Sequence, residues 1–179
     1  MRLFIALPLP AKTLASLESA QMLLRRQGVR GRFAPPDNLH LTLAFLGETP
    51  DPAPAIEATT RVPLPQTTLH FDRLTLFGDV LVLLLKKNDA LEQYVRALRA
   101  ALDEAGISYD RKAFRAHITL CRKTAFPTAS FPLGDLARPL KNVLLPVREV
   151  RLMASDLSGG TPKYSVVFTQ KIRSHEENE

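Results

Sequence analysis

The chain has 179 residues, of which 45% are hydrophobic; this suffices for one compact domain or two closely packed lobes and excludes a disordered chain. The single cysteine, Cys121, excludes an intrachain disulfide and a cysteine-rich zinc site, and it favours a cytoplasmic location. Lys and Arg number 24 against 18 acidic residues, so the charge fits a polyanionic partner, although many soluble proteins are equally basic.

The first predicted element is a buried strand at residues 2–9. Its apolar run is short and interrupted by prolines, which argues against a signal peptide or a membrane span. A helix follows, since Leu14, Leu17 and Leu24 fall on one face and Gly28 ends it. The chain therefore opens with a strand and an amphipathic helix.

A second strand and helix of the same kind begin about 78 residues later. Residues 80–87 predict another buried strand, and Gly106 ends the helix that follows it. We expect Asp89, with Glu92 three residues further on, to cap the start of that helix. Its apolar face is formed by Leu91, Val95, Leu98 and Leu102.

A His-x-Thr-Leu motif follows each helix. The interval from Gly28 to His40 nearly equals the interval from Gly106 to His117, so the two motifs occupy equivalent places. A basic segment precedes each motif, with Arg30 and Arg32 in the first half and Arg111, Lys112 and Arg115 in the second. Further strands are predicted at residues 67–77, 147–157 and 164–172. One structural unit therefore occurs twice.

This repeat predicts an α+β fold with two lobes related by a pseudo-twofold axis. Each lobe is expected to be a small, mainly antiparallel sheet with helices outside, and the lobes face each other across a central cleft. We expect residues 1–179 to form this single bilobal domain, with a His40 half and a His117 half. Residues 174–179 are charged and lack apolar side chains, which predicts a disordered tail. The order of the strands does not follow from the sequence.

Strand alternation places the two motifs at the predicted cleft. In a strand, residues i and i+2 share a face, so His40 and Thr42 point away from the leucines around them. The expected core residues are Leu39, Leu41 and Leu43 in the first motif, and Ile118 and Leu120 in the second. The same parity sends His117, Thr119 and Cys121 to the cleft face. Two imidazoles and two hydroxyls are therefore expected around one ligand.

Such a set suits phosphodiester chemistry without a metal or other cofactor. One imidazole can take a proton from water while the other donates one to the leaving oxygen, because an ordinary histidine titrates near pH ~6.5. Thr42 and Thr119 could donate hydrogen bonds to the non-bridging oxygens. A lone His-x-Thr is more often a structural pair, but two copies at equal places in a repeat favour catalysis. His70 and His175 lack the pattern.

Residues 38–48 (NLHLTLAFLGE) and 115–122 (RAHITLCR) resemble the two motifs of the 2H phosphoesterase superfamily. The similarity is greatest to the RNA 2',3'-cyclic phosphodiesterases, also called 2'-5' RNA ligases, and it extends over nearly the whole chain. It implies hydrolysis of an RNA 2',3'-cyclic phosphate end to a 2'-phosphate, and it allows reversible 2'-5' ligation. The chain has no glycine-rich phosphate loop, so any ligation proceeds without ATP. We expect a monomer with no obligate protein partner and no membrane association.

The resemblance also implies roles that the symmetric motifs leave open. By it, His40 is the proton donor to the leaving 3' oxygen, His117 is the proton acceptor that activates water, and Thr42 and Thr119 contact the phosphate. Members of the superfamily commonly carry proline where this chain has Ala116, a difference expected to affect strand rigidity more than chemistry.

Two further candidates depend on local geometry. The resemblance implies that Arg122 binds phosphate, but strict alternation turns it toward the core unless the strand ends or bulges after Leu120. A solvent-facing arginine at a strand end is the alternative. Phe33 precedes His40 and could stack on a base or belong to the core. The basic segments before the motifs either attract the RNA backbone or form an ordinary solvated face.

Two other functions compete with the enzyme. The first is a module that binds phosphorylated RNA ends or nucleotides without turnover, with the histidines acting only as hydrogen-bond donors. The second is a metallohydrolase, which the sequence disfavours because no carboxylates stand at ligand spacing around the histidines. Activity measurements separate all three.

Overall fold

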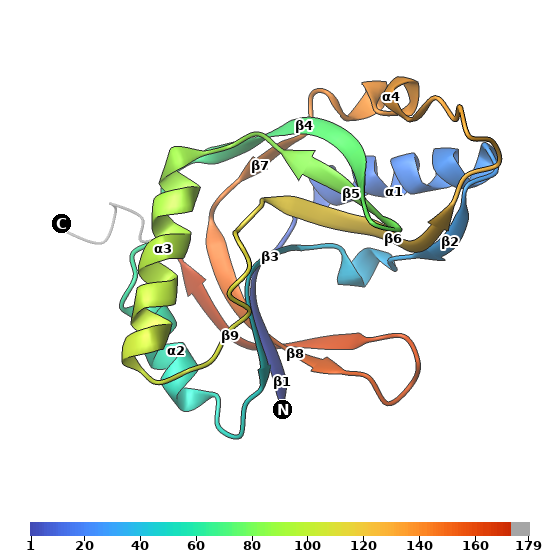
Figure 1. The fold of residues 1–179 in the computed structure, drawn as a ribbon. Helices are drawn as coiled ribbons and strands as arrows, with labels where there is room; N and C mark the ends of the chain where they lie inside the picture. The colour runs from blue at the N-terminus through green and yellow to red at the C-terminus, as the bar shows by residue number, and fades with distance from the viewer. Residues whose placement is uncertain (173–179) are drawn as a thin grey trace.

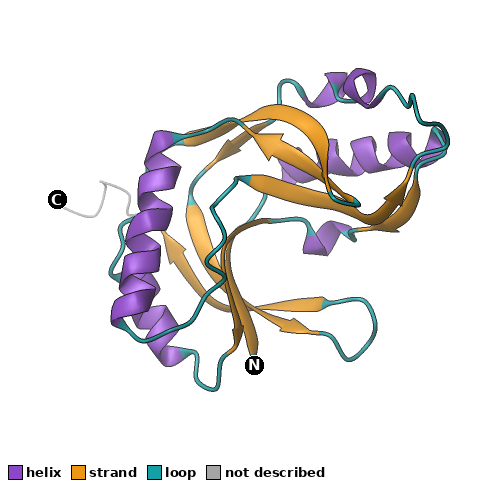
Figure 2. Ribbon diagram, viewed as in Figure 1, coloured by secondary structure: helices purple, strands orange, loops and turns teal. Residues whose placement is uncertain are grey.

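The computed structural model describes residues 1–172, which form an α+β fold of strands and peripheral helices (Figures 1 and 2). The predicted tail at 174–179, with His175, lies outside the described residues. The strands are β1 (Arg2–Leu7), β2 (Arg30–Phe33), β3 (Leu41–Glu48), β4 (Thr68–Phe77), β5 (Val80–Leu85), β6 (His117–Ala125), β7 (Leu144–Pro146), β8 (Glu149–Asp156) and β9 (Lys163–Lys171). The helices are α1 (Ala11–Arg26), α2 (Ala53–Thr60), α3 (Asp89–Glu104) and α4 (Leu133–Leu136), with 3-10 turns η1 (Pro36–Asn38) and η2 (Arg138–Leu140).

The strands pair in the order β7-β4-β5-β6-β3-β1-β8-β9, and β2 pairs with β6; every pair is antiparallel. At the centre, β3 and β6 meet through one residue pair, Leu41 opposite Ile118. This narrow junction divides the sheet into two lobes, as Figure 2 shows. We call them the β5–β6 lobe (β2 and β4–β7, with α1 and α4) and the β1–β3 lobe (β1, β3, β8 and β9, with α2 and α3). The predicted two-lobed, mainly antiparallel architecture is confirmed.

Neither lobe is built from one half of the sequence. The first half supplies β1 and β3 to one lobe but β2 and β4 to the other. The helices cross in the same way: α1 follows β1 but packs on the β5–β6 lobe, where Gln21 on α1 donates to the Leu120 carbonyl of β6. In turn α3 follows β5 but packs beside α2 and β3 (Figure 1). The lobes therefore form one interlocked unit.

The burial of the strands and helices fits the apolar patterns of their sequences. β1 and β5 are buried along almost their whole length, which fits their continuous apolar runs. The four leucine and valine residues predicted for the inner face of α3 are all buried. The cap of α3 was predicted one residue too late, because Asn88, not Asp89, accepts the N–H of Leu91 at 3.0 Å. Among residues 1–172 no helix is long and apolar enough to cross a membrane.

Candidate active site

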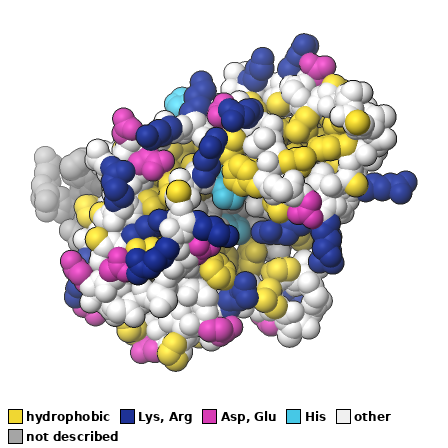
Figure 3. Space-filling view, viewed as in Figure 1, with side chains coloured by type: hydrophobic (Ala, Val, Ile, Leu, Met, Phe, Trp, Pro, Cys, Tyr) yellow, Lys and Arg dark blue, Asp and Glu magenta, His cyan; other side chains and the backbone are white. Residues whose placement is uncertain are grey.

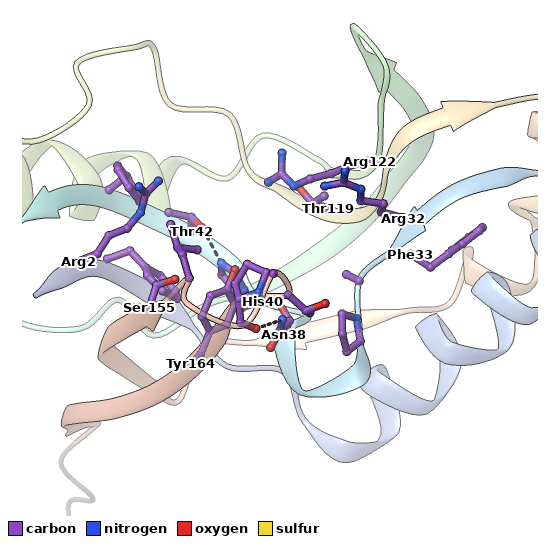
Figure 4. Close-up of a pocket in the computed structure, with 18 of the residues that line it drawn as sticks. Arg2, Arg32, Phe33, Asn38, His40, Thr42, Thr119, Arg122, Ser155 and Tyr164 are labelled. Atoms are coloured by element: carbon purple, nitrogen blue, oxygen red, sulfur yellow. Dashed lines mark hydrogen bonds between the residues drawn. The ribbon is translucent and has the colours of Figure 1, made fainter.

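A cleft of about 730 Å³ lies between the two lobes. Figure 3 shows histidine side chains in this hollow with Lys and Arg side chains on both sides of it. All six side chains predicted for the site line this cleft: Phe33, His40, Thr42, His117, Thr119 and Arg122. The structure therefore brings both motifs to one ligand-sized space, and Figure 4 shows this region in detail.

His40 lies immediately before β3, and the predicted alternation around it holds. The three leucines Leu39, Leu41 and Leu43 are buried, while His40 and Thr42 face the cleft. The Nδ1 of His40 lies 2.7 Å from the backbone oxygen of Asn38. A carbonyl can only accept, so Nδ1 carries a proton and Nε2 is the titrating nitrogen. Nε2 lies 2.8 Å from the hydroxyl of Thr42.

His117 begins β6 and is held in the same way. Its Nδ1 lies 2.6 Å from the backbone oxygen of Arg115, again two residues earlier in the chain. This bond fixes the same tautomer as in His40 and leaves Nε2 to exchange protons. Thr119 lines the same cleft two residues further along β6. Each motif therefore presents an Nε2 atom and a threonine hydroxyl to the space between the lobes.

The two imidazoles differ in their surroundings. The ring of His40 lies 4.9 Å from that of Phe4 and 5.4 Å from that of Tyr164, whose plane is nearly perpendicular to it at 84°. The ring centre of His117 lies 5.1 Å from that of Phe77. Burial lowers the pKa of His40 below its ordinary value of 6.5. The hydrogen bond to the Asn38 carbonyl raises this pKa in part, while the positive charges of His117 and Arg122 lower it further. His40 is therefore mainly neutral at pH 7 in the free protein.

Arg122 reaches the cleft because β6 bulges. In the pairing with β5, Leu81 lies opposite Cys121 while the next residue, Val82, lies opposite Thr119, so Leu120 is an extra residue in β6. The bulge reverses the alternation, so that Arg122 is exposed and lines the cleft. The condition for Arg122 to approach a phosphate is thus met. The same bulge makes the prediction for Cys121 wrong: its side chain is fully buried against the α1 side of the sheet.

Phe33 combines the two roles considered for it. It lines one end of the cleft, but it also packs on the small core cluster that contains Leu24 and Cys121. The guanidinium of Arg25 lies 4.5 Å from the centre of its ring. In Figure 4 the ring points away from His40, so a base contact at Phe33 stays a prediction.

The basic segments are only partly at the cleft. Arg32 from the first segment lines it, whereas none of the three basic residues of the second segment does. Arg111 instead forms an ion pair with Asp103 at 2.6 Å. The expectation that both basic segments flank the cleft is therefore met by Arg32 of the first segment and not by the second segment.

Several lining residues were not predicted. Arg2, Phe4, Ser155 and Tyr164 line the cleft, together with residues of the loop between β8 and β9. They come from β1, β8 and β9, and only the pairing of these strands brings them near His40. Asn38 could have been identified from the sequence, because it belongs to the first motif. Its side chain donates a hydrogen bond to the Pro162 carbonyl at 2.8 Å and so links the β8–β9 loop to the segment that carries His40. Within residues 1–172 no three His, Cys, Asp or Glu side chains are grouped to hold a metal ion.

Comparisons of the sequence and of the structure with known proteins point to the same family. The family model described as LigT-like phosphoesterase matches residues 7–82 and again residues 83–164. An RNA 2',3'-cyclic phosphodiesterase from Thermus thermophilus is 30% identical over 100% of this chain and 94% of its own length. One of the same name from Geobacillus stearothermophilus is 28% identical over 92% of this chain, which spans only 55% of that relative. The crystal structure of E. coli LigT without ligand superposes with a TM-score of 0.78 at 28% identity, covering 97% of this chain and 98% of LigT. The chain belongs to the LigT-like phosphoesterase family.

Proposed function

We propose that this protein hydrolyses 2',3'-cyclic phosphate ends of RNA to 2'-phosphomonoesters, with His40 and His117 as the acid/base pair. The observation that carries the proposal is the shared cleft. The two histidines come from separate copies of the repeated motif, yet they are held by identical Nδ1–carbonyl bonds and line the same space. The names of the relatives support the substrate class, and a crystal structure of E. coli LigT contains 3'-AMP.

In the proposed reaction His117 accepts a proton through Nε2 from a water molecule, whose oxygen attacks phosphorus. The bond between phosphorus and the 3' oxygen breaks, and protonated His40 donates its Nε2 proton to that oxygen. The products are a 3' hydroxyl and a 2'-phosphate. With the 5' hydroxyl of a second RNA in place of water, the same steps form a 2'-5' linkage without ATP, and the reverse reaction exchanges the two roles.

The environment of His40 couples its protonation to substrate binding. The free protein disfavours the positive form, because the ring is buried and lies near other cations. A phosphate anion between the histidines offsets this repulsion and favours protonation of His40. Thr42, Thr119 and Arg122 are proposed to donate hydrogen bonds to the non-bridging oxygens, which gain charge in the transition state.

The experiment is an assay of adenosine 2',3'-cyclic phosphate and of a short RNA with the same end. His40→Ala and His117→Ala should each lower kcat by about 10²- to 10⁴-fold, because each removes a positioned proton-transfer group. His70→Ala is the matched control, since His70 is exposed on β4 away from the cleft. Circular dichroism and melting temperature verify that the variants are folded.

The same assay separates the competing functions. Binding without turnover in the intact protein would favour the non-catalytic module, and unchanged turnover in either histidine variant would refute the acid/base pair. Activity should persist in excess chelator; a loss restored by a divalent ion would indicate a metallohydrolase instead. Phosphorus NMR of the product identifies which hydroxyl keeps the phosphate. Analytical ultracentrifugation tests the prediction that the protein is a monomer, and the predicted cytoplasmic location requires a separate measurement in cells.

A further inference from the structure

Two cleft arginines lie next to each other with no acidic partner. Arg32 on β2 and Arg122 on β6 are register partners across the β2–β6 pair, and both are exposed and line the cleft. Figure 4 shows both side chains on the Thr119 side of the cleft. Neither takes part in an ion pair among residues 1–172. Adjacent cations repel each other, so a bound anion between them lowers the free energy of this arrangement.

The backbone holds this pair in place. Gly31 has a φ of +149°, and a Cβ atom there would lie 2.6 Å from the sulfur of Cys121 and 2.7 Å from the backbone oxygen of Arg122. β2 can therefore approach β6 this closely only with glycine at that position. The bulge at Leu120 then turns Arg122 toward the cleft on the same side as Arg32. Both arginines extend from paired strands rather than from free loops.

A single cyclic phosphate leaves this charge in excess. A 2',3'-cyclic phosphodiester carries one negative charge, and under the proposed function protonated His40 and the two threonines already contact it. Arg122 lines the same cleft as His40 and Thr119, so it faces the space in which the scissile phosphate is proposed to bind. A guanidinium has five donors and can bridge two anions. Arg32 has no anion left to bind unless the substrate brings a second one.

In RNA the nearest second anion is the phosphodiester that joins the terminal nucleotide to the preceding one. We propose that Arg32, with Arg122 shared between the two phosphates, forms a subsite for this phosphodiester. The subsite makes the cleft selective for RNA ends over cyclic mononucleotides. This inference rests on the proposed function and names the substrate of that same site.

The test compares adenosine 2',3'-cyclic phosphate, which has a 5' hydroxyl, with the dinucleotide ApA that ends in the same cyclic phosphate. The intact protein should give roughly tenfold higher kcat/KM for the dinucleotide, as a charge-assisted contact supplies. The logarithm of kcat/KM should also fall more steeply with the logarithm of salt concentration, by a slope of about 0.7 for one added phosphate contact. A dinucleotide with a neutral methylphosphonate linkage should lose both advantages.

Variants assign the subsite to Arg32. Arg32→Gln should bring the dinucleotide preference to about one, and Arg32→Lys should keep part of it because the charge remains. Arg73→Gln is the matched control, since Arg73 lies on β4 outside the cleft and pairs with Asp72; it should retain the full preference.

Three outcomes would overturn the subsite. They are an equal loss on both substrates in Arg32→Gln, a preference that survives the methylphosphonate, and equal kcat/KM for both substrates in the intact protein. In each case the proposed function still stands. If the protein cleaves neither substrate, the proposed function fails as well.

Discussion

Replacement of Gly31 by alanine tests how Arg32 and Arg122 are held. Gly31 lies in β2 with a φ of +149°, and an added Cβ would meet the Cys121 sulfur at 2.6 Å, the Arg122 oxygen at 2.7 Å and the Lys123 oxygen at 3.0 Å. Two of these atoms belong to the backbone of β6 and cannot rotate away. The variant therefore has to separate β2 from β6 or distort both.

The structure gives the size of the effect. An L residue in this conformation costs about 1–3 kcal/mol, and overpacking of a close contact costs about 1–3 kcal/mol more. The midpoint of the sum is about 4 kcal/mol, and for a chain of this size each kcal/mol lowers Tm by about 2–4 °C. Gly31→Ala should therefore lower Tm by about 8–16 °C.

Two other glycines separate the contributions. Gly78 also has a positive φ, +62°, but nothing lies within 4 Å of its added Cβ, so Gly78→Ala should cost only about 1–2 kcal/mol. Gly134 in α4 has neither restriction, and Gly134→Ala should be neutral or stabilise by up to about 1 kcal/mol.

The assay is thermal unfolding by circular dichroism, with urea unfolding as the check on ΔG. The expected order of stability is Gly134→Ala, then Gly78→Ala, then Gly31→Ala. If Gly31→Ala were as stable as Gly134→Ala, β2 and β6 would not be in the close contact described above. The arginine subsite would then lack the rigid backbone support inferred for it.

Two further predictions concern stability. The pKa of His40 is lowered from 6.5 in the folded protein, so the unfolded chain takes up a proton there more readily. Acidification from pH 7.5 to 5.5 should therefore lower Tm more in the intact protein than in His40→Gln. An equal dependence of Tm on pH in the two proteins would contradict this. The Tyr94 hydroxyl is buried without a hydrogen-bond partner among the described residues, so Tyr94→Phe should stabilise by about 1 kcal/mol in urea unfolding; a loss of stability would reveal a partner for that hydroxyl.

The order of residues along the chain sufficed to predict most of the strands and the local geometry of each motif, whereas β2, β7 and α4 were not predicted. Strand alternation depends only on neighbouring residues, so the burial of Leu39 and Leu41 and the exposure of His40 to the cleft followed from their spacing. The two long helices, α1 and α3, could be placed for the same reason, because their apolar residues repeat at helical spacing. The duplicated motif pointed to a cleft between lobes, and the resemblance named the family.

Strand pairing, and the place where alternation fails, became known only from the folded chain. The exchange of strands and helices between lobes depends on contacts between residues far apart in the chain, and it brings Arg2 and Tyr164 into the same cleft as His40. The bulge at Leu120 depends on how β6 pairs with β5, a property of two strands at once, and it buries Cys121 while turning Arg122 to the cleft. Periodicity describes one strand, whereas register and bulges minimise the free energy of several strands together, so a single strand's sequence cannot specify them.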